Sequence, residues 1–229
     1  MKFPYSPIDL THALEQSIPT WDGDCGFQHR VRSNYDACPN EVKFRVGEFA
    51  MQSGIGTHLD APAHCIPGAS TIDQISLEKL IAPCVVIDVS NHCDENYRVS
   101  PQDIKNFEKE FSLILPGTFV MIKTGWERFW EEPEKYRNNH RFPSVSKEAA
   151  SLLIEKDVCG LGIDTLSPDC PESGFPVHQL FLQSNKLIVE NAANLHDLPK
   201  IGSFILVIPI KAKEATEAPI RLFALIPTT

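Results

Sequence analysis

The length of the chain allows one large domain or two small ones, and the lack of a repeat or an evident linker favours a single domain over residues 1–229. Hydrophobic residues make up 42% of the chain and charged residues 22%, which is typical of a soluble globular protein and disfavours a disordered one. The formal net charge of −9 disfavours binding to phosphate backbones and to anionic lipid. We therefore expect neither nucleic acid nor a membrane as a partner.

The N-terminus and the cysteines indicate a cytoplasmic protein. No apolar run follows the charged start of the chain as it would in a secretory signal. No stretch approaches the roughly 20 apolar residues that a membrane helix needs. The seven cysteines are an odd number and form no Cys-x-x-Cys pair, so neither a disulfide framework nor a structural zinc knuckle is expected.

The predicted elements alternate between strands and helices. In chain order they are a strand at 42–46, a short helix at 76–80, a strand at 84–89, a helix at 102–111, a strand at 118–123, a helix at 147–156, and strands at 158–163, 203–210 and 220–226. The first strand is predicted because Val42, Phe44 and Val46 alternate with charged residues, and the others because their apolar runs are continuous. Ser100 and Ser146 are the expected caps of the two longer helices. This order indicates an α/β protein with a mixed sheet and flanking helices.

One short segment carries candidate metal ligands, namely His58, Asp60 and His64. Residues two apart in an extended chain point to one face, so His58 and Asp60 are expected to project together. His64 has the same parity and joins them if the chain stays near-extended or bends locally at Pro62. Two imidazoles and a carboxylate form a nitrogen and oxygen site for a divalent cation. A hydrogen-bonded pair on the surface is the alternative interpretation of His58 and Asp60.

The segment 56–64, Gly-Thr-His-Leu-Asp-Ala-Pro-Ala-His, resembles the signature of the cyclase superfamily, which contains the bacterial kynurenine formamidases and isatin hydrolases. Other segments are similar to that family in the same order along the chain: Asp-Leu-Thr-His at 9–12, Lys-Thr-Gly-Trp at 123–126, Gly-Ile-Asp-Thr-Leu-Ser at 162–167, and His178 and Glu190, twelve residues apart. The resemblance covers nearly the whole chain. It implies the swivelling β/β/α fold of that family, with a mixed sheet and flanking helices, and a homodimer or homotetramer.

The resemblance also implies a ligand set. A single divalent metal ion would be held by His58, Asp60, His178 and Glu190, with zinc preferred and manganese as the alternative. Gly54 stands where the family has its first histidine. Glycine has no donor atom, so a second metal ion would lack that ligand.

Further residues are candidates for supporting roles. His64 is the candidate general acid/base, because an imidazole near an activated water can take its proton and pass it to the leaving group; a further metal ligand is the alternative. Asp164, at the end of a predicted strand, is a candidate to orient a ligand histidine, or else a turn residue. An aromatic substrate pocket could be lined by Trp21, Phe27 and Trp126, for which core packing is the alternative.

The predicted function is metal-dependent hydrolysis of a small amide, lactam or related carbonyl compound, with an activity like that of arylformamidases on C–N bonds other than peptide bonds. One alternative is a cyclic amide or lactone hydrolase of the isatin hydrolase type. The other is a degenerate member that binds a metal without catalysis. The expected partner is a small-molecule substrate.

Overall fold

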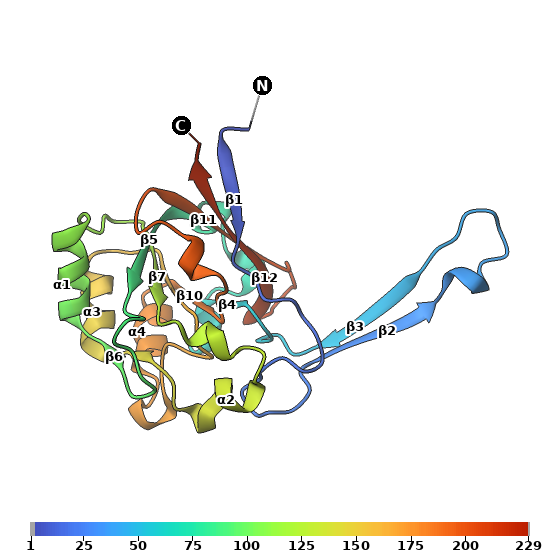
Figure 1. Cartoon of the computed structure of the whole chain (residues 1–229), viewed down its shortest axis with the longest axis horizontal. Coiled ribbons are helices and arrows are strands. Elements are labelled where there is room, and N and C mark those ends of the chain that lie inside the picture. The colour runs from blue at the N-terminus through green and yellow to red at the C-terminus, as the bar shows by residue number, and fades with distance from the viewer. Residues whose placement is uncertain (1–2, 229) are drawn as a thin grey trace.

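A computed structural model describes residues 3–228 of the chain (Figure 1); Met1 and Lys2, which belong to the N-terminal stretch considered above, and Thr229 lie outside the described residues. The centre of the fold is an eight-stranded mixed sheet in the order β1-β12-β11-β5-β7-β9-β10-β4. Across residues 3–228, no helix is both long enough and apolar enough to cross a membrane.

The sheet closes on itself because β4 pairs with two strands, β10 on one side and β12 on the other. The parallel strands are β5 (Ile81–Asp88), β7 (Phe119–Lys123), β9 (Gly160–Ile163) and β10 (Leu187–Glu190). The antiparallel strands are β1 (Tyr5–Asp9), β4 (His58–Asp60), β11 (Ser203–Pro209) and β12 (Glu217–Pro227). The short strand β4 is thus fixed by two neighbours that lie far from it in sequence.

Side chains alternate between the inside of this barrel-like sheet and its outer face, as the pleat of a strand requires. Leu59, Met121 and Leu222 contribute to a buried cluster inside the sheet. The outer face carries α1 (Pro101–Glu110), α3 (Lys147–Glu155) and α4 (Pro176–Gln183). These helices pack on the parallel strands through a second buried cluster, to which Phe181 of α4 and Ile188 of β10 belong.

A two-stranded hairpin projects from this body (Figure 1). Its strands are β2 (Phe27–Ser33) and β3 (Val46–Met51). Apolar side chains on the hairpin face solvent, with Val42, Phe44, Val46 and Phe49 between 51% and 64% exposed. The remaining elements are α2 (Pro133–Arg137) and the short parallel pair β6 (Arg98–Val99) and β8 (Ser144–Val145).

The structure corrects one of the predicted elements and shortens another. The strand predicted at 42–46 is wrong, because β3 begins only at Val46 and the preceding residues form the exposed end of the hairpin. The short helical segment predicted at 76–80 is present as the 3₁₀ helix Leu77–Lys79. The other predicted strands and helices are confirmed with ends shifted by a few residues, and Ser100 and Ser146 cap α1 and α3 as expected.

Candidate metal centre

Strand pairing brings three of the predicted ligands together. His58 on β4 lies directly opposite Glu190 on β10, and Leu59 between the two candidate ligands of β4 points into the core. His58 and Asp60 therefore share the outer face, as their spacing predicted. His58 Nε2 is 3.3 Å from Glu190 Oε2 and 3.7 Å from Asp60 Oδ1.

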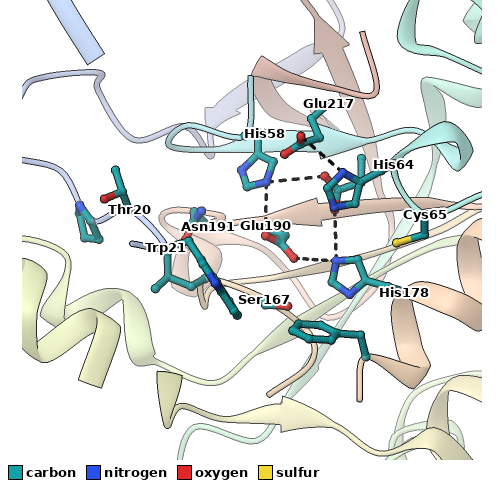
Figure 2. Close-up of a pocket in the computed structure, with 15 residues that line it drawn as sticks. Thr20, Trp21, His58, His64, Cys65, Ser167, His178, Glu190, Asn191 and Glu217 are labelled. Carbon is teal, nitrogen blue, oxygen red and sulfur yellow. Dashed lines mark ion pairs between the residues drawn. The ribbon is translucent and has the colours of Figure 1, made fainter. Parts of the chain in front are cut away.

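The fourth predicted ligand, His178, comes from the first turn of α4, which packs on the same face. Its Nε2 is 3.3 Å from Glu190 Oε1 and 3.6 Å from Asp60 Oδ2. All four side chains are buried. Figure 2 shows His58, His178 and Glu190 converging on one point from two strands and a helix.

Each histidine is oriented through its other ring nitrogen. His58 Nδ1 is 2.8 Å from the carbonyl oxygen of Gly56, which can only accept, so Nδ1 must carry the proton. His178 Nδ1 is 2.9 Å from Asp169 Oδ2. Both rings thereby present Nε2 to Asp60 and Glu190, the arrangement typical of histidines that bind a metal ion.

The turn before β4 holds that carbonyl in place. Gly56 has φ of 62°, and a Cβ there would lie 2.6 Å from a methyl carbon of Leu14, so the turn requires glycine. The side chain of Asn191 donates to the Gly56 carbonyl at 2.9 Å. Thr57 Oγ1 donates to the Asn191 carbonyl at 2.7 Å, which ties the turn to the end of β10.

The donor set fits a divalent cation. Both carboxylate oxygens of Asp60 and Oε1 of Glu190 are buried and have no hydrogen-bond partner among the described residues. Such oxygens are costly to bury unless they are paired or bind a metal ion. Two imidazole nitrogens and two carboxylates suit zinc or manganese. A cation at this point would therefore satisfy groups that the protein leaves unpaired.

The pKa values describe the same electrostatic preference. Burial alone would lower the pKa of His58, but the hydrogen bond to Glu190 and the charges of Asp60 and Glu190 raise it to about 9. Burial of His178 is likewise outweighed by Asp169, Asp60 and Glu190, which raise its pKa well above the ordinary value. Burial would raise the pKa of Glu190, yet the two histidines lower it. The site thus favours positive charge, from protons or from a metal ion.

His64 lies beside these four residues, in the 3₁₀ turn Pro62–His64, so the chain bends at Pro62 instead of staying extended. Its side chain is 31% exposed, and its Nδ1 is 3.4 Å from Glu217 Oε1. One donor atom each of His64, Asp60 and His178 lie within 4.8 Å of one another. This position is compatible with both roles considered for His64, proton transfer and metal binding.

A cavity of about 460 Å³ opens above the ligands. His58, Asp60, His178 and Glu190 contribute to its wall, together with apolar residues and several polar ones; the apolar part consists of Pro19, Trp21, Leu166 and Phe175 (Figure 2). The indole of Trp21 stacks on His140 with ring centroids 4.1 Å apart. A predominantly apolar cavity with a few polar groups at one end is typical of a small-molecule site.

Two of the three aromatic residues predicted to line the pocket lie elsewhere. Phe27 is buried in the cluster at the base of the hairpin, with its ring 5.6 Å from that of Phe49. Trp126 is buried too, and its indole nitrogen donates to the Tyr136 carbonyl at 2.8 Å. Only Trp21 of the three lines the cavity. The alternative of core packing is the correct one for Phe27 and Trp126.

The predicted orienting role of Asp164 is also corrected. Its carboxylate accepts hydrogen bonds from Thr124 N, Thr124 Oγ1 and Gly125 N, so it holds the end of β7. Burial raises its pKa to about 6. The carboxylate that touches a candidate ligand is Asp169. The sequence does not reveal it, because its spacing of nine residues from His178 matches no periodic element.

Comparison with known proteins places the chain in a family. The Cyclase family model, described as "Putative cyclase", matches residues 8–170. The chain belongs to this family. An isatin hydrolase of Roseibium aggregatum is 30% identical over 187 residues, which cover 75% of this chain and 71% of that protein. A kynurenine formamidase of Bacillus mycoides is 25% identical over 220 residues, or 93% and 94% of the two chains.

Solved structures agree with the cyclase-family assignment. An isatin hydrolase bound to the product analogue thioisatinate superposes with a TM-score of 0.91 at 27% identity, covering 98% of this chain and 94% of that one. The structure of a predicted metal-dependent hydrolase from Bacillus stearothermophilus gives a TM-score of 0.77 at 25% identity, over 96% and 98%. The predicted cyclase-like α/β fold is confirmed, and so is the prediction of a metal-dependent hydrolase.

Proposed function

We propose that this cyclase-family enzyme hydrolyses the amide or lactam bond of a small aromatic compound. The observation that supports this most directly is a cluster of two histidines and two carboxylates at one end of a mainly apolar cavity. The relatives are named isatin hydrolase and kynurenine formamidase. Both names fit a substrate with an aromatic ring and a carbonyl bonded to nitrogen.

In this proposal His58, Asp60, His178 and Glu190 hold one divalent metal ion, with zinc preferred over manganese. When bound, such an ion polarises a carbonyl and makes water acidic enough to ionise near neutral pH. The four side chains supply two neutral imidazoles and two carboxylates, and both kinds of donor bind zinc. Gly54 offers no donor, so we propose one metal ion per chain.

The remaining roles belong to residues around the cavity. His64 accepts a proton from the attacking water and returns it to the leaving nitrogen, which general acid/base catalysis requires. Trp21 and Phe175, whose rings are 6.0 Å apart, offer apolar surface to an aromatic ring of the substrate. The volume of about 460 Å³ accommodates one small molecule.

Two measurements on the same preparation test this proposal. Elemental analysis of protein purified without chelator is expected to find about one zinc or manganese ion per chain, and Glu190→Gln is expected to lose most of it. N-formylkynurenine and isatin are then offered to the loaded protein. Hydrolysis of either compound that disappears in Glu190→Gln supports the proposal. Bound metal without hydrolysis of small amides and lactams would favour the non-catalytic metal-binding alternative.

Isatin-type lactam hydrolysis is the second candidate for the substrate. It is favoured by the 30% identity to the Roseibium aggregatum isatin hydrolase and by the TM-score of 0.91 to an isatin hydrolase structure. The ratio of kcat/KM for isatin to that for N-formylkynurenine decides between the two. An excess for the lactam would make ring opening the main activity.

We further propose that the chain forms a homodimer or homotetramer through the β2–β3 hairpin. An isolated two-stranded hairpin is at best marginally stable in water, and this one exposes Val42, Phe44, Val46 and Phe49. A second copy that covers these side chains would remove that apolar surface from water.

The described cysteines are all free thiols, which fits a reducing compartment, and the cytoplasmic location stays a prediction.

A further inference from the structure

Glu217 faces the metal centre from a third strand and has no place in the ligand set above. It is the first residue of β12 and lies directly opposite Asp60 on β4. Its neighbour Ala218 points into the core, so Glu217 points outward with the ligands. Its Oε1 is 3.4 Å from His64 Nδ1 and 3.4 Å from Ser53 Oγ. Figure 2 shows the carboxylate above His58 and next to His64.

The carboxylate occupies space that exists only because residue 54 is glycine. A Cβ added to Gly54 would lie 2.1 Å from Glu217 Oε2 and 3.5 Å from His58 Nε2. Any larger residue at this position would therefore displace Glu217. The φ of Gly54 is outside the left-handed region, so the backbone accepts alanine and the constraint on this position is one of space. Gly54 and Glu217 form a sterically matched pair.

The carboxylate of Glu217, placed beside Gly54, fixes the orientation and the tautomer of the His64 imidazole. The side chain of His64 is partly exposed, and its only charged contact among the described residues is with Glu217. A carboxylate accepts and cannot donate, so the neutral His64 ring carries its one proton on Nδ1 and keeps the lone pair on Nε2. Without this partner the ring could flip or change tautomer. An imidazole that is to accept a proton from water needs one fixed nitrogen free.

We propose that Glu217 is a positioning residue that holds His64 as the Nδ1–H tautomer with Nε2 free for proton transfer, and that Gly54 provides the room for it. The role of His64 in this proposal rests on the proposed hydrolytic function. The tautomer of His64 does not, because it can be measured without substrate. The space beside Gly54, the position of the family's first histidine, is thus occupied by a carboxylate that contacts His64.

The first test is spectroscopic. In the zinc-loaded protein, long-range ¹H–¹⁵N spectra of the histidine rings, with the His64 signals assigned by their loss in His64→Gln, are expected to show the Nδ1–H tautomer. Glu217→Ala is expected to shift His64 toward the Nε2–H tautomer or a mixture, while the zinc content stays that of the parent. Glu214→Ala, at an exposed glutamate three residues earlier, is the control and should change neither. An unchanged tautomer in Glu217→Ala, or loss of zinc from it, would overturn the proposal.

The second test is a double-mutant cycle on turnover. Glu217→Ala is expected to lower kcat about tenfold or more with little change in KM. Glu217→Gln keeps an acceptor oxygen, so its kcat is expected to lie between those of Glu217→Ala and the parent. Gly54→Ala should lower kcat in the parent but add little in Glu217→Ala, because the two positions share one interaction. Strict additivity of the two losses would contradict the coupling. If no substrate is turned over, the proposed function fails while the tautomer test still decides the positioning role.

Discussion

The hydrogen bonds of Asp169 orient His178, so replacing Asp169 is expected to weaken metal binding. Asp169 accepts from Val177 N at 3.1 Å, from His178 N at 2.9 Å and from His178 Nδ1 at 2.9 Å. In Asp169→Asn one oxygen becomes an NH₂ group that faces a donor. If Oδ1 is replaced, Val177 N loses its acceptor and the first turn of α4, which carries His178, is loosened. If Oδ2 is replaced, His178 loses the partner that directs Nε2 toward Asp60 and Glu190.

The expected magnitude follows from such orienting contacts in metal sites. Their loss typically weakens metal binding about 10- to 100-fold, which corresponds to about 1.4–2.8 kcal/mol. We expect the zinc affinity of Asp169→Asn to fall by this amount. The assay is equilibrium competition with a chromophoric chelator, together with thermal unfolding to confirm that the variant is folded.

Asp164→Asn is the matched control, because Asp164 is also a buried carboxylate with three donors but touches no candidate ligand. It should lose stability and keep its zinc affinity. Two results would show that Asp169 does not orient His178. One is a folded Asp169→Asn with the parent's affinity, and the other is an equal loss of affinity in both variants, which would indicate general destabilisation.

Three further predictions concern other parts of the molecule. His64→Ala should abolish turnover while its metal content, measured by elemental analysis, stays near normal; a loss of metal would make His64 a ligand. Burial against Trp130 lowers the pKa of His12 from 6.5 to about 4. The unfolded chain therefore binds a proton more readily than the folded one, and the free energy of unfolding should fall by at most about 3 kcal/mol as the pH drops from about 6.5 to 4. Urea unfolding at several pH values checks this, and an undiminished slope in His12→Asn would contradict it. Phe49→Ser on the hairpin should reduce the molar mass measured by light scattering, whereas Leu115→Ser, an exposed site on the body, should not; an unchanged mass in Phe49→Ser would count against the hairpin as the interface.

Much of the fold could be predicted because its central strands are buried on both faces. Continuous apolar runs such as those of β5 and β7 have few other interpretations, and serine caps locate the starts of α1 and α3. The strand predicted at 42–46 failed for a physical reason. Its alternation of apolar and charged residues resembles a half-buried strand. The end of the hairpin packs on no core within the described chain, so its apolar side chains are exposed and the alternation does not mark a buried face.

The site was predictable only where the chain itself brings ligands together or where the family resemblance connects distant segments. The spacing of His58 and Asp60 is local, and β4 confirms that they share a face. Glu217 could not be found in this way, since its proximity to His64 depends on the pairing of β4 with β12. Asp169 acts across a loop without periodicity. The position of an aromatic residue such as Trp126, in a core or in a cavity, is likewise decided by packing that no local pattern reveals.

The proposed metal site can be located directly by anomalous diffraction at the zinc absorption edge from crystals of the protein loaded with one equivalent of zinc. One strong peak is expected, in contact with Nε2 of His58, Nε2 of His178 and the carboxylates of Asp60 and Glu190. A dominant peak bound by other residues, or none within this cluster, would contradict the proposed site.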